Sequence, residues 1–158
     1  MKWIESAGGP LVLVSWDDVS MWSGYEGDYE AACAVKDLTG VVRFGDEVDG
    51  KSALVIWGEP LATAYLADEK ILVQWMYADT EDDLLRMVGH ELSAAVWQEG
   101  PSITLAHRLV LFDAAVPGDE LNADDVLEVE LASGVYQIQT TDVASGRRAA
   151  RLYRLTAT

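Results

Sequence analysis

The stretch Ile71–Trp97 places the tightest limits on the fold of this chain of 158 residues. It opens with ILVQWMY, a β-branched and aromatic run short enough for one strand. Thr80 and Asp83 then have the spacing of a capping box, in which the hydroxyl accepts a hydrogen bond from the N3 amide. Apolar residues follow at helical spacing, and Gly100-Pro101 is expected to end the helix: Leu84, Leu85, Val88, Leu92, Ala95 and Val96. One long amphipathic helix needs a sheet to lie on, so we predict an α+β fold.

The remaining sequence predicts mostly strands around this unit. Two short N-terminal helices are expected at Trp16–Trp22 and Tyr29–Val35, capped by Ser15 and Asp28. Near the C-terminus, VLEVEL, VYQIQTT and RAARLYRLT alternate almost strictly and predict a three-strand antiparallel meander. Further strands are expected at 3–5, Leu11–Ser15, Thr39–Phe44, Ala53–Trp57, Ala62–Leu66, Ser102–Ala106 and Arg108–Asp113. We therefore predict one domain over residues 1–158, with an antiparallel sheet, one long helix, two short helices and this meander.

Charge is the strongest global feature of the composition. The chain has 27 acidic and 11 basic residues, for a net charge of −16. Such a surface repels nucleic acid and anionic membranes and attracts basic partners, although acidic surfaces also simply keep proteins soluble. The start lacks the pattern of a signal peptide, no apolar run approaches the roughly 20 residues that span a bilayer, and the single cysteine suits a reducing compartment. We expect a cytoplasmic protein.

Residues Gly45–Ser52, GDEVDGKS, match the G-x-x-x-x-G-K-S pattern of a phosphate-binding P-loop. That chemistry requires a helix that begins at the serine, whereas the β-rich run ALVIW follows here. Asp46, Glu47 and Asp49 would also face a polyphosphate with three carboxylates. A hairpin loop is the favoured interpretation, and nucleotide binding is the alternative.

Other catalytic chemistry rests on few residues. Cys33 could act as a nucleophile with His90 or His107, but its setting AACAV favours a structural cysteine in a helix core. Neither histidine has a Cys or His at metal-ligand spacing. Asp119–Asp125, DELNADD, resembles a calcium loop but lacks its glycine and its later glutamate. We expect no catalytic residues, no cofactor and no metal.

The segment 16–30 is the most suggestive surface for a protein partner. Trp22 and Tyr25 border a Ser-Gly turn among acids, as aromatic anchors for a basic partner would, although a tryptophan folded over a neighbouring strand fits the same pattern. The other tryptophans, Trp16 included, are interpreted as core residues. Asp79–Asp83 and Asp119–Asp125 are competing acidic sites, the first explained by helix capping and the second without an aromatic anchor. The predicted partner-binding residues are Asp17, Asp18, Trp22, Tyr25, Glu26, Asp28 and Glu30.

Several stretches together resemble the immunity protein twenty-one family of bacterial polymorphic toxin systems. They are WIESAGGPLVLV, the turn WSG, GDYEAACAV, LVIWGEPLATAYL, VQWMYAD with the acidic helix after it, VLFDAAVPGDE, and the final GVY and LYRL. The resemblance covers nearly the whole chain, and GDEVDGKS is not part of it. It implies a small cytoplasmic protein that binds and neutralises a cognate toxin domain encoded nearby, without catalysis of its own. Charge adds that this toxin should be basic, as a nuclease would be.

Overall fold

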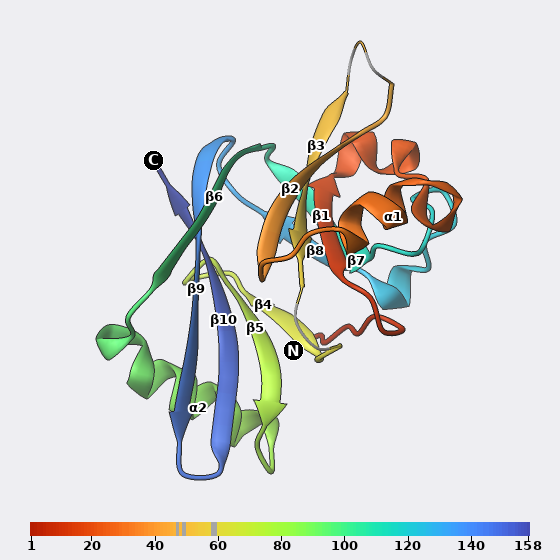
Figure 1. Cartoon of the computed structure of the whole chain (residues 1–158). Coiled ribbons are helices and arrows are strands. Elements are labelled where there is room, and N and C mark those ends of the chain that lie inside the picture. Colours follow the sequence, from red (N-terminus) through yellow and green to blue (C-terminus); the bar gives the residue numbers. More distant parts are fainter. Residues whose placement is uncertain (47, 49, 58–59) are drawn as a thin grey trace.

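The computed structural model describes residues 1–46, 48, 50–57 and 60–158, and Figure 1 shows two β-sheets with helices on their outer sides. The strands are β1 (Leu11–Ser15), β2 (Thr39–Phe44), β3 (Lys51–Ile56), β4 (Thr63–Leu66), β5 (Ile71–Tyr77), β6 (Gln98–Leu105), β7 (Arg108–Asp113), β8 (Leu127–Glu130), β9 (Gly134–Ser145) and β10 (Arg148–Ala157). The helices are α1 (Asp28–Cys33) and α2 (Glu81–Glu91), with short 3-10 helices η1 (Trp16–Met21), η2 (Gly24–Glu26), η3 (Leu92–Ala94) and η4 (Ala123–Asp125).

The two antiparallel sheets pack face to face. The N-sheet has the order β2-β3-β1-β7-β8, and the C-sheet has the order β4-β5-β10-β9-β6. Side chains from both sheets interdigitate in the core between them, among them Leu11, Leu13, Leu54, Leu72, Ile138, Tyr153 and Leu155. Burial of this apolar surface is the main force that holds the sheets together.

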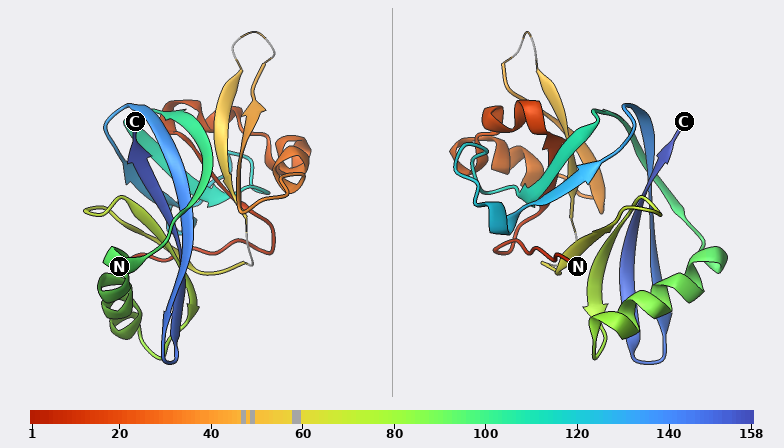
Figure 2. Two further views of the ribbon diagram at one scale, coloured as in Figure 1. Left: turned by 60° about the vertical axis from the view of Figure 1, so that its left-hand side comes forward. Right: turned by 180° about the vertical axis from the view of Figure 1, so that it is seen from behind.

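Each sheet is also buried on its outer face, because successive residues of a strand point to opposite sides. In β1, Leu11 and Leu13 face the other sheet, whereas Val12 and Val14 face the helices η1, η2 and α1. On the C-sheet, Val73 and Leu152 pack under α2. Figure 2 shows α2 and the N-terminal helices on these two opposite outer sides. The uninterrupted apolar run of β1 is therefore explained by burial on both faces.

Helix α2 begins as predicted and ends earlier than predicted. The Asp83 amide donates to the Thr80 hydroxyl over 3.1 Å, which confirms that half of the capping box. The helix gives way to η3 and stops before residue 95, and the side chain of Val96 is 86% exposed. Residues 100–101 lie inside β6, at a register irregularity between Glu99 and Ser102. Because β6 is an edge strand, a bulge there accommodates a proline.

The predicted C-terminal meander is wrong in its pairing. Strand β8 pairs with β7 in the N-sheet, whereas β9 pairs with β10 and β6 in the C-sheet. Alternating side chains identify a strand but do not identify its neighbour, and the short connection after β8 carries the chain from one sheet to the other. The structure is mostly antiparallel sheet with few helices, which agrees with the predicted α+β class in outline. The strands nevertheless form two sheets where one was expected.

Two interior tyrosines differ in how their hydroxyls are satisfied. The Tyr153 hydroxyl donates to the Trp57 carbonyl over 2.7 Å, whereas the buried Tyr65 hydroxyl has no hydrogen-bond partner among the described residues. We expect Tyr153→Phe to lower the free energy of unfolding by about 1 to 3 kcal/mol, because it leaves the Trp57 carbonyl without this donor. Tyr65→Phe should leave that free energy unchanged or raise it by up to about 1 kcal/mol. Urea unfolding followed by tryptophan fluorescence measures both, and equal losses would contradict this difference.

The same residues predict a loss of stability at alkaline pH. Burial raises the pKa of Tyr65 to about 12 from its ordinary value of 10.0, and it also raises the pKa of Tyr153. The folded state thus holds these protons more tightly than the unfolded state. The contribution of the protonated tyrosines to the free energy of unfolding is therefore complete below pH 10 and is lost as the pH rises towards 12. We expect the Tm to fall across this interval, and to fall less in Tyr65→Phe. If calorimetry gave the same fall of Tm with pH for the wild-type chain and for Tyr65→Phe, Tyr65 would not contribute to the alkaline loss of stability.

Candidate partner-binding surface

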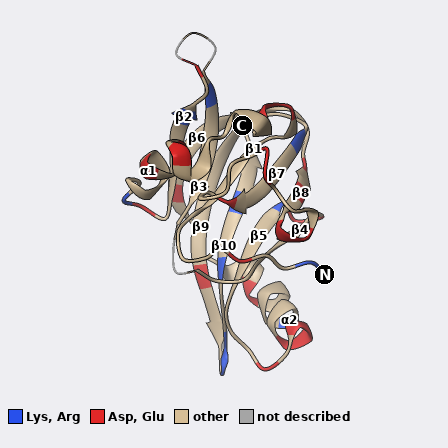
Figure 3. Cartoon of the chain, turned by 90° about the vertical axis from the view of Figure 1, so that its right-hand side faces the viewer, with Lys and Arg blue, Asp and Glu red and all other residues tan. Residues whose placement is uncertain are grey.

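The predicted partner-binding segment forms a helical layer, η1, η2 and α1, over the outer face of the N-sheet (Figure 1). The expected first helix is a 3-10 helix, and Ser15 at its N-cap makes no side-chain capping bond. The second helix starts at Asp28 and ends at Cys33, earlier than predicted, with Gly27 at its N-cap. Figure 3 shows acidic residues in red on α1, and others on α2.

Trp22 anchors this layer from within. Its side chain is only 1% exposed, its Nε1 donates to the Ala114 carbonyl over 2.8 Å, and its ring meets Phe44 edge-on. A tryptophan whose N–H finds a partner can be buried in full. The prediction that Trp22 is an accessible anchor is therefore wrong, and the alternative of a tryptophan folded over the neighbouring strand describes it.

Residues 114–120 interlock with the helical layer through backbone contacts. The Tyr25 amide donates to the Ala115 carbonyl over 2.9 Å, and the Gly118 amide donates to the Trp22 carbonyl over 2.8 Å. A Cβ at Gly118 would lie 1.6 Å from the Val19 carbonyl oxygen, which no side chain tolerates. Gly24 adopts φ +58° where the chain turns against Pro117. These contacts fix the position of Tyr25 relative to residues 119 and 120.

Asp28 has a structural role in the same layer. Its carboxylate accepts from the Ser23 amide over 2.8 Å, and its own amide donates to the Ser23 hydroxyl over the same distance. This reciprocal pair closes the turn around η2 and leaves Asp28 half-buried. The predicted capping of α1 by the Asp28 side chain is wrong, and its contact with a partner stays a prediction.

Tyr25 is more exposed than the other described aromatic residues of the layer, with 64% of its surface accessible. Its pKa is raised, first by the negative charge of Glu120 and further by limited burial, Glu26 and Asp119. The acidic residues at 119–120, which sequence analysis treated as a competing site without an aromatic anchor, thus lie beside the tyrosine. We call Tyr25, Glu26, Asp119 and Glu120 the Tyr25 patch. Sequence reasoning missed its second half because the two segments are far apart in the chain.

The other predicted contact residues lie in the helical layer with different exposure. Asp17 and Glu30 are exposed, and Asp18 is half-buried. Trp16, interpreted as a core residue, is 38% exposed, and the Arg108 guanidinium lies 5.5 Å from the centre of its ring. The core assignment of Trp16 is wrong. Whether any of these residues touches a partner stays a prediction.

The residues of the enzyme alternative are not brought together. Cys33 is exposed on α1 and does not lie in a helix core as predicted, whereas His90 is exposed on α2, so both sheets lie between them. Cys33 contacts Tyr29, whose pKa the thiol raises through a hydrogen bond. His107 is bound through Nδ1 to the Leu131 carbonyl at 2.6 Å. No nucleophile–base pair follows from these positions.

The P-loop interpretation fails at its geometric requirement. Gly45–Ser52 connects β2 to β3, which pair as an antiparallel hairpin with Phe44 opposite Lys51 and Arg43 opposite Ser52. The lysine and serine therefore lie in a strand where a P-loop needs the start of a helix. Glu47 and Asp49 of this motif lie outside the described residues.

The part of the chain that the structure describes shows neither a metal-binding cluster nor a membrane-spanning helix. Within it, no group of three or more His, Cys, Asp and Glu side chains is placed to hold a metal ion. In the calcium-like stretch, Asn122 accepts from the Asp124 amide over 3.0 Å and so caps η4. No helix among the described residues is long and apolar enough to cross a membrane.

The family model described as immunity protein 21 matches residues 2–149, which is nearly the whole chain. No curated protein and no solved structure matches.

Proposed function

The chain belongs to the immunity protein 21 family, and on this basis we propose that it binds and neutralises a cognate toxin domain encoded beside its own gene. Immunity proteins of this kind act by binding, and the positions of Cys33, His90 and Lys51 support no catalytic alternative. Family membership is the observation that carries the proposal. We further propose that the protein works in the cytoplasm, where a toxin domain would otherwise act on the cell that makes it.

The charge of the chain supports a basic toxin. A net charge of −16 creates a field that speeds the encounter with a positively charged protein and repels nucleic acid. Toxins with basic active clefts, nucleases above all, are the partners that this field suits best. In this proposal the protein competes with the anionic substrate for the same cleft.

The Tyr25 patch is the surface that we propose for first contact. It places one exposed aromatic ring among three carboxylates, and backbone bonds to residues 115 and 118 hold it in position. An aromatic anchor with charged neighbours is the usual composition of an energetically important contact. Asp17, Asp18 and Glu30 of the same layer would extend this surface, whereas Trp22 and Asp28 would support it from beneath.

Co-expression tests the function directly. The product of the neighbouring gene should arrest growth when expressed alone, and growth should return when this chain is expressed with it. The two proteins should also co-purify through a tag on either one. A catalytically inactive toxin variant is the control, since it should bind without any effect on growth. A neighbouring product that is harmless alone, or that forms no complex, would refute the proposal.

A further inference from the structure

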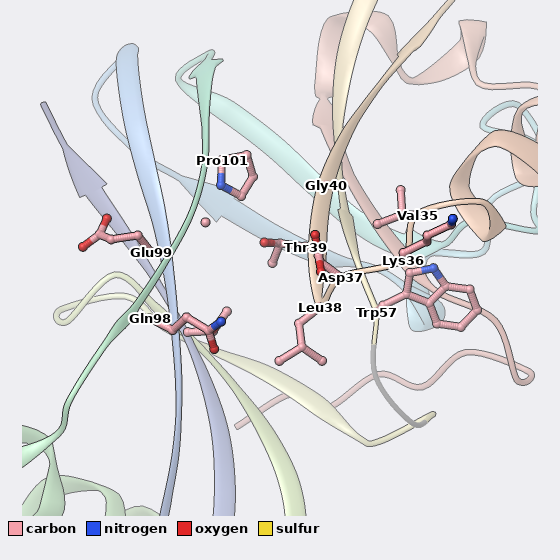
Figure 4. A pocket seen from close by; sticks show the side chains of 12 residues that line it. Val35, Lys36, Asp37, Leu38, Thr39, Gly40, Trp57, Gln98, Glu99 and Pro101 are labelled. Carbon is pink, nitrogen blue, oxygen red and sulfur yellow. The ribbon is translucent and has the colours of Figure 1, made fainter.

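A cleft of about 1000 Å³ opens between the two sheets on the side where β2 and β6 are edge strands (Figure 4). Leu38 forms an apolar part of its wall, and Gln98 enters it from the C-sheet. A Cβ at Gly100 would lie 2.9 Å from the Thr39 hydroxyl oxygen, so the two edges nearly touch there. The cleft is thus the space that opens where β2 and β6 diverge from the contact between Gly100 and Thr39.

Two threonine hydroxyls line the cleft without partners of their own. The side chains of Thr39 and Thr140 are only 8% and 6% exposed. Neither hydroxyl hydrogen-bonds to any other residue that the structure describes, and Figure 4 shows the Thr39 side chain directed into the cleft. Tyr65 Oη is the buried side-chain polar atom that lacks a partner among the described residues, so the two threonine oxygens are open to the cleft and can hydrogen-bond to a segment that enters it.

The backbone of β2 also presents unpaired groups. Trp57 donates its amide to the Leu38 carbonyl over 2.8 Å, which makes residues 38 and 57 a hydrogen-bonded pair. Such pairs alternate along an antiparallel ladder, so Gly40 pairs towards β3 whereas Thr39 and Val41 point their N–H and C=O groups away from it. An edge of this kind is a template for another strand.

The charges in and around the cleft indicate what kind of segment would bind there. The mouth of the cleft carries Lys36 and Asp37, which offset each other, and Glu99 turns away to accept from Gln139 over 2.6 Å (Figure 4). The cleft itself is therefore nearly neutral, within a molecule of net charge −16. A segment with small neutral side chains inside the cleft and basic residues at its flanks satisfies both conditions.

We propose that an extended, basic segment of the toxin enters this cleft and adds to β2 as a further strand. This inference rests on the proposed function and gives the toxin a second contact beside the Tyr25 patch. Backbone bonds to Thr39 and Val41 provide the affinity, and the two hydroxyls and Gln98 align the segment. A second copy of this chain is the competing occupant.

Hydrogen exchange of the backbone amides tests this placement. In the free chain the amides of Thr39 and Val41 should exchange fast, because they point away from β3. Addition of the purified toxin domain from the neighbouring gene should slow both at least about tenfold, as new ladder bonds form. The amide of Gly40, already paired with β3, should change little and is the internal control.

Two variants separate contact from fold. The double variant Thr39→Val, Thr140→Val removes both hydroxyls without loss of volume and should raise the Kd for the toxin domain about tenfold. Val41→Pro removes an amide that β3 does not use, so an edge strand tolerates it, and it should raise the Kd at least as much. Thr104→Val, an exposed threonine of β6 outside the cleft, is the matched control and should leave the Kd unchanged.

The outcomes distinguish the two proposals. If the wild-type chain binds the toxin domain while Thr39 and Val41 exchange as before and the variants bind normally, the cleft is not the site and the proposed function stands. If the wild-type chain forms no complex, both proposals fail. Protection of the two amides in the free chain that grows with protein concentration would show a second copy in the cleft and overturn the inference.

Discussion

Replacement of Gly118 by alanine should destabilise this protein more than the same replacement at any other described glycine. The new Cβ would lie 1.6 Å from the Val19 carbonyl oxygen, a backbone atom that cannot rotate away. The Val19 segment or residues 114–120 must therefore move, and the bond from the Gly118 amide to the Trp22 carbonyl is lost with them. We expect a loss of about 3 kcal/mol in the free energy of unfolding.

Gly89→Ala is the matched control for this variant. Gly89 lies inside α2 with no atom within 4 Å of an added Cβ, so alanine there should stabilise the helix by about 0.5 to 1 kcal/mol. Chemical unfolding of both variants gives the two free energies. Gly118→Ala with wild-type stability would show that the helical layer does not sit against residues 114–120 as described.

Reversal of the Tyr25 patch should produce the largest effect on association. The triple variant Glu26→Lys, Asp119→Lys, Glu120→Lys replaces the three carboxylates around Tyr25 with cations. For a basic toxin domain we expect the association rate constant at low salt to fall by at least about tenfold, and the remaining rate to depend less on salt. Stopped-flow fluorescence at several salt concentrations measures both quantities.

The control for this variant makes the same change in net charge elsewhere. Asp68, Glu69 and Asp79 are exposed at the ends of β4 and β5 in the C-sheet and are reversed to lysine in the same way. This control should slow association much less, because the contribution of a charge falls with its distance from the contact. Equal slowing by both triple variants would show that net charge alone matters and would remove the Tyr25 patch as the contact surface.

Local features of this fold were predictable from the sequence. The Thr80 cap and the strand Ile71–Tyr77 depend on residues that are neighbours in the chain. The hairpin of β2 and β3 follows from two apolar runs around a polar loop, which also excluded the P-loop. Propensity and periodicity act over a few residues, so they describe such elements well.

The features that the sequence did not predict depend on contacts between segments that are distant in the chain. The burial of Trp22 is decided by the Ala114 carbonyl, and the position of Glu120 beside Tyr25 is decided by the packing of Gly118 on Val19. Likewise β8 joins the N-sheet through its pairing with β7, although its own alternation suits either sheet. Exposed Cys33 shows the same limit, since its neighbours in the chain are apolar while its helix turns that side to solvent.

We propose that this acidic protein captures its toxin by direct, electrostatically assisted binding. The most direct test is the association rate constant of the purified chain with the purified toxin domain from the neighbouring gene, measured from low to physiological salt. We predict a saturable complex whose association slows steeply as salt rises, while dissociation changes little. No complex, or association that is indifferent to salt, would contradict the account.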